Sequence, residues 1–320
     1  MILCCGEALI DMIPTPTVAG PLGYVPHCGG AVFNTAIALG RLGAEVGLLT
    51  GLSSDLFGDQ LRARLGESHV DAAHCIVSDR PTTLAFVDLQ EGQARYSFFD
   101  ENSAGRMLVP TQLPRLSSQV SALYFGGISL ACEPCGDSYA QLCAQHAPDH
   151  FVMLDPNIRS NFIADEDRFR TRLVAMIGQA DILKVSDEDL QWLDRRAVSV
   201  REKAKSLLRE GPEIVILTLG QEGAVAFTRS GACLEVTASP VSVVDTVGAG
   251  DTFNAGLLAS LAAQGLLSKA ALSTLSPESL HKAVAFGIAV AGVTVSRAGA
   301  NPPWAAELGE PQLETTAQPC

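Results

Sequence analysis

Short, mostly apolar runs alternate with amphipathic stretches along this chain of 320 residues. Strands that are apolar on both sides and joined by helices predict a parallel sheet covered by helices on both faces, an α/β architecture. Ligands bind such a sheet outside the carboxyl ends of its strands. The predicted strands are residues 2–5, 46–50, 122–125, 151–154, 182–184 and 214–218, and the predicted helices are residues 31–42, 55–65, 137–145, 167–177 and 200–209.

One segment breaks this alternation. Residues 84–87 and 96–99 have the composition of two strands, and Glu91-Gly92 between them is typical of a turn. We interpret this hairpin as an insertion that folds over a binding site.

Composition and charge exclude several classes of partner. With 47% hydrophobic residues the chain can bury the core of one large domain. Its formal net charge of -13 argues against nucleic acid and anionic membranes as partners. The apolar runs are too short or too interrupted to cross a bilayer, and the N-terminus does not resemble a signal peptide. We therefore expect a cytoplasmic protein with reduced thiols.

The nine cysteines do not form the pattern of a disulfide framework. Cys132 and Cys135 make one Cys-x-x-Cys pair. Because no second pair accompanies it, this spacing is a weak indication of zinc.

The segment 244–253 carries the strongest chemical signal. Gly248, Ala249 and Gly250 leave backbone N–H groups open toward one point, and the apolar helix that follows adds its positive N-terminal end. Such a place suits a phosphate or an oxyanion. Asp251 would repel that anion unless it removes a proton from an attacking hydroxyl group. The alternative is that Asp251 and Thr252 form an ordinary N-terminal cap of the helix.

Three further segments suit a sugar and a phosphate. Gly29 and Gly30 allow close approach to the backbone, and Asn34 lies in the first turn of the next helix, where its amide suits sugar hydroxyls. Asp11 can accept two hydroxyl hydrogen bonds, and Arg159 follows a strand end where it suits a phosphate oxygen. A loop turning into a helix, a surface aspartate and a surface salt bridge are the competing interpretations.

Several enzyme classes lack their motifs here. The chain has no Gly-x-x-x-x-Gly-Lys-Ser/Thr loop, no Gly-x-Gly-x-x-Gly at the first helix, and neither His-Glu-x-x-His nor Gly-x-Ser-x-Gly. These absences argue against P-loop enzymes, dinucleotide dehydrogenases, zinc proteases and serine hydrolases.

Taken together, these segments resemble the ribokinase-like (PfkB) sugar kinases, and bacterial fructokinases most among them. The resemblance covers about residues 2–305. It rests on Gly29-Gly30-x-x-x-Asn34, Gly51-x-x-x-Asp55-x-x-Gly58, Asp155-Pro156-Asn157-x-Arg159 and the segment 245–253. It implies a three-layer αβα ribokinase-like fold with a mostly parallel central sheet and a small β-sheet lid. The kinase domain would span residues 1–310, with lid segments at about 12–28 and 82–103, and residues 311–320 would form a tail.

The resemblance also assigns roles to single residues. Asp251 is implied as the catalytic base, and Gly248, Ala249 and Gly250 as the anion hole for the γ-phosphate of ATP. Sugar hydroxyls are expected at Asp11, Gly30 and Asn34, with Arg159 near the sugar or the phosphate. The nucleotide is expected at Lys184, Thr218, Gly220, Gly223 and Gly250.

Two departures from the family pattern concern metal ions. The family's Asn-x-x-Glu segment appears here as Ser186 to Asp189, so a water-mediated contact of Asp189 with Mg²⁺ rests on a shorter side chain. A loop for a monovalent cation, potassium in the family, would involve Asp245, Val247 and Gly299, beside the altered segment at Pro302-Pro303.

The predicted function is an ATP-dependent and Mg²⁺-dependent sugar kinase that phosphorylates the primary hydroxyl of a ketohexose, D-fructose above all. Other acceptors stay open: ribose, a nucleoside stacked on Phe98 or Phe99, or 2-keto-3-deoxygluconate, whose carboxylate would need Arg159 or Arg95. A non-catalytic sugar or nucleotide sensor is the alternative from another class. A homodimer through the lid residues Leu84, Phe86, Tyr96 and Phe98 is a further expectation.

Overall fold

The computed structural model describes residues 1–90 and 93–308, and the side chains of these except 88–90 and 93–95. Its central sheet has eight strands in the order β14-β13-β12-β11-β10-β9-β1-β4. The six strands from β12 to β4 run parallel, and β13 and β14 are added at the β12 edge by antiparallel pairing. The predicted mostly parallel sheet is therefore confirmed. The strands are β1 (Ile2–Cys5), β4 (Val46–Leu49), β9 (Ala122–Gly126), β10 (Phe151–Asp155), β11 (Ile182–Ser186), β12 (Ile214–Thr218), β13 (Ala224–Thr228) and β14 (Cys233–Val236).

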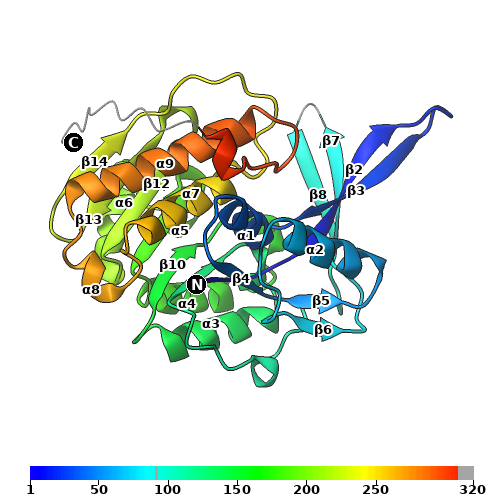
Figure 1. The fold of residues 1–320 in the computed structure, drawn as a ribbon, viewed down its shortest axis with the longest axis horizontal. Helices are drawn as coiled ribbons and strands as arrows, with labels where there is room; N and C mark the ends of the chain where they lie inside the picture. Colours follow the sequence, from blue (N-terminus) through cyan, green and yellow to red (C-terminus); the bar gives the residue numbers. More distant parts are fainter. Residues whose placement is uncertain (91–92, 309–320) are drawn as a thin grey trace.

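Helices cover both faces of this sheet (Figure 1). Alternate residues of β1 point to opposite faces, so Ile2 and Cys4 join one hydrophobic core and Leu3 and Cys5 the other. The predicted three-layer fold is therefore confirmed. The first core is covered by α1 (Ala31–Arg41), α2 (Leu56–Glu67), α7 (Ala249–Ala263), α8 (Lys269–Leu272) and α9 (Pro277–Val295), and the second by α3 (Cys135–His146), α4 (Glu166–Ile177), α5 (Asp187–Leu193) and α6 (Val200–Leu207).

Helix α9 corrects one expectation from the sequence. By length and composition it is apolar enough to cross a membrane, although the apolar runs were expected to be too short or interrupted. In the fold it packs on α7 through two glycines: a Cβ atom at Gly256 would lie 2.8 Å from the Cα atom of Gly287. Its buried residues Leu280, Val284 and Val290 make it a core helix.

A second sheet of four strands, the lid, projects from the body (Figure 1). Its order is β3-β2-β7-β8, and β2 and β7 pair in parallel. The first lid strand already begins at Leu9, directly after β1. The strands are β2 (Leu9–Pro16), β3 (Leu22–Gly29), β7 (Leu84–Gln90) and β8 (Gln93–Phe99), and a separate pair is formed by β5 (Gly51–Ser53) and β6 (Ile76–Ser78). The expected turn at 91–92 and tail at 311–320 lie outside the described residues.

The lid has an inner and an outer face. Asp11 pairs with Ala85, and Ala85 with Phe98, so these residues share one face. Phe98 packs edge-on against Phe162 of the body, with ring centres 4.1 Å apart, which makes this the inner face. Tyr96 packs beside Phe98 on the same face.

The outer face carries the residues next in sequence to Ala85 and Phe98, such as Phe86 and Phe99. Phe86 contacts Tyr24 and Phe99 there, with ring centres 5.0 and 5.3 Å away. The four residues expected to form a dimer interface therefore divide between two faces, because side chains alternate along a strand. Leu84 and Phe86 lie on the outer face, and Tyr96 and Phe98 on the inner one.

The topology also locates a crevice. Strand β1 lies between β4 and β9. After β1 the chain first forms β4 on one side of it and later forms β9 on the other side. The carboxyl ends of two such neighbouring strands leave a crevice between them, which is where parallel sheets bind ligands. Glu7 follows β1 and Ser129 follows β9 at this place.

Candidate active site

Asp251 lies in the first turn of α7, facing the N-terminal end of α1. The helix begins at Ala249, and Gly248 before it has the left-handed φ of 78° that glycine favours. The helix is therefore capped at Gly248, and the interpretation of Asp251 as an ordinary N-terminal cap is wrong. Burial raises the pKa of Asp251 to about 7, although Asn34 lowers it by donating a hydrogen bond of 2.9 Å from Nδ2 to Oδ2.

The start of α7 carries a positive side chain as well as its free N–H groups. A Cβ atom at Gly250 would lie 3.3 Å from Nζ of Lys184, so only a glycine lets the ammonium group come this close without displacement. A Cβ atom at Gly248 would lie 2.8 Å from the Cβ atom of Ala300. Two of the three small residues of the expected anion hole, Gly248 and Gly250, thus each allow one close approach.

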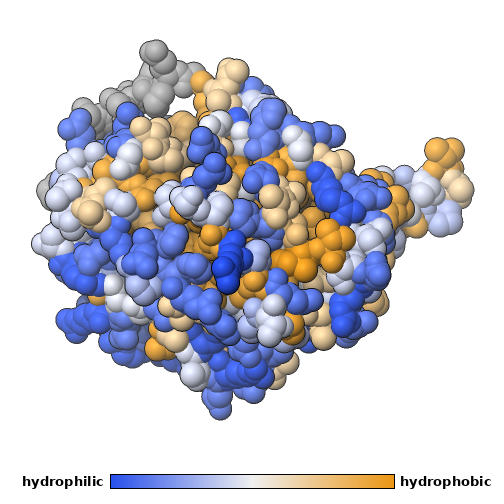
Figure 2. Space-filling model, turned by 60° about the horizontal axis from the view of Figure 1, so that its bottom comes forward, coloured by the Kyte–Doolittle hydropathy of each residue, from blue (hydrophilic) through white to orange (hydrophobic). Residues whose placement is uncertain are grey.

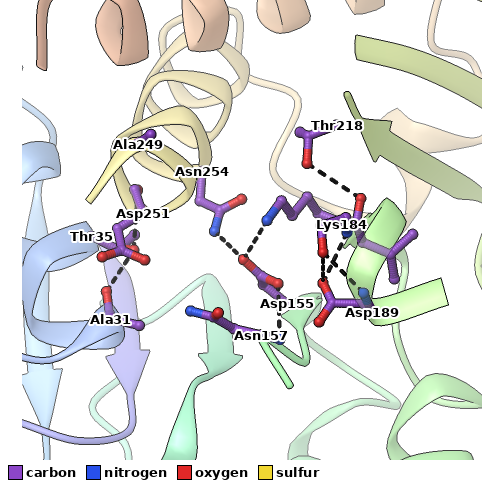
Figure 3. Close-up of polar contacts among 12 residues, drawn as sticks. Ala31, Thr35, Asp155, Asn157, Lys184, Asp189, Thr218, Ala249, Asp251 and Asn254 are labelled. Carbon is purple, nitrogen blue, oxygen red and sulfur yellow. Dashed lines mark hydrogen bonds and ion pairs between the residues drawn. The ribbon is translucent and has the colours of Figure 1, made fainter. Parts of the chain in front are cut away.

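Lys184 is buried and belongs to a polar cluster at the strand ends (Figure 3). Its Nζ atom lies 3.0 Å from Oδ2 of Asp155, which also accepts a hydrogen bond of 2.7 Å from Asn254. Burial lowers the pKa of Lys184, but the charges of Asp155 and Asp189 outweigh burial and raise it. The lysine is therefore charged at neutral pH and close to where the helix would receive a phosphate.

Sequence reasoning did not assign the residues that hold this cluster together. Asn254 donates to the hydroxyl of the buried Tyr124 over 3.0 Å, and Thr35 donates to the backbone oxygen of Asp251 over 3.1 Å. The position of Asp155 at a strand end was visible in the sequence. Tyr124 lies inside the apolar strand β9, and no sequence motif marks it as a site residue.

Glu7 occupies the crevice between β1 and β9. Its carboxylate accepts hydrogen bonds from the backbone N–H of Ala31 at 3.0 Å and from N and Oγ of Ser129 at 3.2 and 2.8 Å. A Cβ atom at Gly127 would lie 2.0 Å from Oε1, so the loop after β9 must carry a glycine there. Glu7 thereby fixes the N-terminal end of α1, where Gly30 adopts a φ of 105°.

The expected sugar residues are found around this end of α1. Asp11 lies on the inner face of the lid, and burial raises its pKa to about 6. Asn34 faces Asp251, as described, and Gly30 precedes α1. Arg159 is exposed and donates to its own neighbour, the oxygen of Ile158, at 3.1 Å.

Tyr96 links the lid to these groups. Its pKa is raised first by burial and then by the negative charge of Asp11, and Arg159 lowers it. Asp251 adds to the increase. The phenol therefore lies within electrostatic reach of both carboxylates at the inner face of the lid.

The other expected nucleotide residues, Thr218, Gly220 and Gly223, lie at and after the carboxyl end of β12. Thr218 ends β12 and donates from Oγ1 to the oxygen of Val185 at 3.4 Å. Gly220 is exposed, with a φ of 57°, and a Cβ atom there would have no neighbouring atom within 4 Å. Gly223 is confined instead, since a Cβ atom there would lie 2.1 Å from the oxygen of Val236. The exposed side chains of Val241, Val243 and Val244 follow in the loop after β14.

The carboxylate of Asp189 is held by backbone and hydroxyl donors. Oδ2 accepts from N and Oγ of Ser186 at 2.8 Å each, and Oδ1 accepts from the N–H of Ile158 at 2.7 Å. Within the part of the chain that the structure describes, no three His, Cys, Asp or Glu side chains gather as a metal site. Both oxygens of Asp189 therefore already accept hydrogen bonds from protein groups.

The three residues expected around a monovalent cation do come together. Asp245 accepts from the N–H of Val247 at 3.0 Å and from the N–H of Gly299 at 2.9 Å. This carboxylate joins the loop before α7 to the loop after α9. Cys132 and Cys135, in contrast, are separate buried thiols away from these loops.

The model of the pfkB family of carbohydrate kinases matches residues 1–307. The chain belongs to this family. A fructokinase from Rhizobium leguminosarum bv. trifolii is 46% identical to this kinase over 285 residues, which cover 88% of this chain and 86% of the relative.

Two solved structures show the same fold. A fructokinase from Xylella fastidiosa with bound ATP is 29% identical to this kinase, with a TM-score of 0.86 over 93% of each chain. A double mutant of the fructokinase from Vibrio cholerae O395, with fructose, ADP and potassium bound, is 26% identical, with a TM-score of 0.82 over 93% of each chain. The ribokinase-like fold expected from the sequence is confirmed.

Proposed function

We propose that this kinase transfers the γ-phosphoryl group of ATP to the primary hydroxyl of D-fructose, giving fructose 6-phosphate and ADP. The observation that carries the proposal is the buried Asp251, which has a pKa of about 7 and lies at the start of α7. The resemblance to fructokinases that bind fructose, ADP or ATP supports the choice of substrates.

Asp251 accepts the proton of the sugar hydroxyl as that oxygen attacks phosphorus. A base is most effective when its pKa lies near the working pH, and burial places the pKa of Asp251 there. The hydrogen bond from Asn34 keeps Oδ2 in place and leaves Oδ1 for the hydroxyl. Asp11 on the lid orients the other sugar hydroxyls. Closure of the lid excludes water from the site.

Negative charge that develops on the transferred phosphoryl group is met by the start of α7 and by Lys184. The ammonium group lies beside Gly250 and keeps its partner Asp155, so a phosphate oxygen bound at the start of α7 would be near it. Gly220 and Gly223 border the nucleotide beyond Thr218. This assigns the charge stabilisation to fixed groups, as phosphoryl transfer requires.

Two cations would assist the reaction by adding positive charge near the phosphates. Mg²⁺ binds few carboxylates and keeps water and phosphate oxygens as ligands, so Asp189, whose two oxygens already accept hydrogen bonds, would reach it through water. When bound it neutralises phosphate charge. A monovalent cation, K⁺ by likeness to the Vibrio cholerae structure, would be held at the loops joined by Asp245, beside Val247 and Gly299, and would add positive charge near the anion hole.

Other acceptors have less support. A nucleoside would stack on Phe98 or Phe99, but Phe98 is packed on Phe162 and Phe99 lies on the outer face of the lid. For 2-keto-3-deoxygluconate, Arg159 is the described candidate cation, and the side chain of Arg95 lies outside the described residues. A sensor would have no use for a buried base with a pKa near 7.

A second copy of this chain is the proposed partner of the lid's outer face. Phe99, Tyr24 and Leu22 are 58, 48 and 67% exposed there, and hydrophobic residues also gather at the tip of the projecting β2–β3 hairpin (Figure 2). Exposed apolar surface of this extent is typical of an interface.

The test is a coupled ADP-release assay with ATP and Mg²⁺ on fructose, ribose, 2-keto-3-deoxygluconate and adenosine. We expect fructose to give by far the highest kcat/KM, and Asp251→Asn to lower kcat on it by ~10²–10⁴ without unfolding the protein. Turnover of another acceptor would move the substrate assignment alone, whereas wild-type turnover by Asp251→Asn would remove the mechanism.

A further inference from the structure

A cavity of about 300 Å³ lies between the inner face of the lid and the body. Tyr96, Phe98 and Phe162 supply aromatic walls, and Asp100 and Arg106 supply charges. Glu133 and Asp165 also line it, so its charged walls consist of three carboxylates and one guanidinium group.

The cavity adjoins the acceptor site. Phe98 lies in the same cross-strand row as Asp11, on the same face and two strands away, which is about 10 Å. Tyr96 lines the cavity, and the negative charges of Asp11 and Asp251 raise its pKa. An acceptor held at Asp11 would therefore lie within about 10 Å of this cavity.

The guanidinium group of the cavity is already engaged. Nη1 of Arg106 lies 2.8 Å from Oδ1 of Asp100, and Nε donates to the backbone oxygen of Glu133 at 3.2 Å. Asp100 is 6% exposed, and its other oxygen accepts a contact of 3.6 Å from Sγ of Cys132. Arg172 contacts the Glu133 carboxylate from the side of α4. Fixed partners thus orient Arg106 toward Asp100.

This arrangement leaves the cavity without a cation for an anionic acceptor. A carboxylate placed there would lose water and lie beside the carboxylates of Asp100 and Asp165. It would also find Arg106 already paired with Asp100, while Glu133 is paired with Arg172. A neutral sugar has no such penalty, and its hydroxyls can donate to the carboxylates.

We propose that Asp100 determines acceptor specificity by occupying Arg106, so that this kinase accepts neutral sugars and rejects sugar acids. The inference rests on the proposed function and deepens it, because it assigns the choice between fructose and 2-keto-3-deoxygluconate to one ion pair. It also predicts which residue to change in order to reverse the preference.

The experiment compares kcat/KM for fructose and for 2-keto-3-deoxygluconate in wild type, Asp100→Asn, Asp100→Ser and the double variant Asp100→Asn/Arg106→Met. Asp149→Asn, the same change at an exposed position of the body, is the matched control. In wild type we expect the sugar acid to be at least ~100-fold poorer than fructose. Asp100→Asn frees Arg106 and should raise the ratio of sugar acid to fructose by ~10–100-fold, the usual effect of a charged hydrogen bond.

The outcomes separate the two proposals. Fructose turnover by wild type tests the function, and the ratio tests the specificity. The gain should disappear in the double variant and be absent in Asp149→Asn. An unchanged ratio in both single Asp100 variants, or equal use of the two acceptors by wild type, would overturn the role of Asp100. If Asp100→Asn does not fold, as judged by circular dichroism, Asp100→Ser and the wild-type ratio decide.

Discussion

At the scale of single residues, the site depends on how burial and one amide set the pKa of Asp251. Burial moves this pKa upward to about 7, and the hydrogen bond from Asn34 moves it downward. The base works only when it is deprotonated, so activity must increase as the pH rises through this value. We expect kcat/KM of the free enzyme to fall about tenfold per pH unit below pH 7, measured as a pH–rate profile from pH 5 to 9.

Asn34→Ala should move this acidic limb to higher pH, because the carboxylate loses a donor that favours its charged form. Thr35→Val is the matched control, since Thr35 donates to the backbone oxygen of Asp251 and not to its carboxylate. It should leave the position of the limb unchanged. A limb at the same pH in Asn34→Ala would show that Asn34 does not tune the base.

Short motifs surround Asp251 and Lys184, so sequence patterns singled them out as candidates. They did not show that Asn34 contacts Asp251 across 217 positions, or that Tyr124 anchors Asn254. Such contacts depend on how α1 and α7 cross over the sheet, which periodicity does not encode. The same limit applies to Asp189, whose oxygens the fold supplies with local donors.

At the scale of elements, most strands and helices were predictable within a few residues, because apolar runs and helical spacing are local signals. The strand expected at 182–184 extends to Ser186, since β12 pairs with it along its whole length. Helix α9 was missed. Its apolar residues are spread around the helix rather than along one face, so it lacks the polar stripe that marks a surface helix.

The contact between α7 and α9 also predicts a stability effect. Gly256→Ala would place a methyl group 2.8 Å from Gly287 and should destabilise the fold by about 1–3 kcal/mol through overpacking. Gly66→Ala is the matched control, because no atom lies within 4 Å of its added methyl group in α2. It should stabilise by about 0.5–1 kcal/mol. Urea denaturation of both variants measures the difference, and equal effects would contradict the tight crossing.

At the scale of the whole molecule, the outer face of the lid predicts the oligomeric state. Phe99→Glu places a charge in the middle of the exposed aromatic cluster and should convert a dimer to a monomer by light scattering. Val174→Glu, at a residue 61% exposed on α4, should leave the dimer intact. A wild-type monomer at micromolar concentration would end the proposal.

The parallel pairing of β2 with β7 has a consequence for the order of folding. Ile10 pairs with Leu84, so the two halves of the lid meet only after α1, β4 and α2 have brought them together. Closing so long a loop costs entropy that only a folded body can offset. In pulsed hydrogen exchange during refolding, lid amides should become protected after those of the central sheet. A newly made chain would therefore acquire its fold first and its sugar site last.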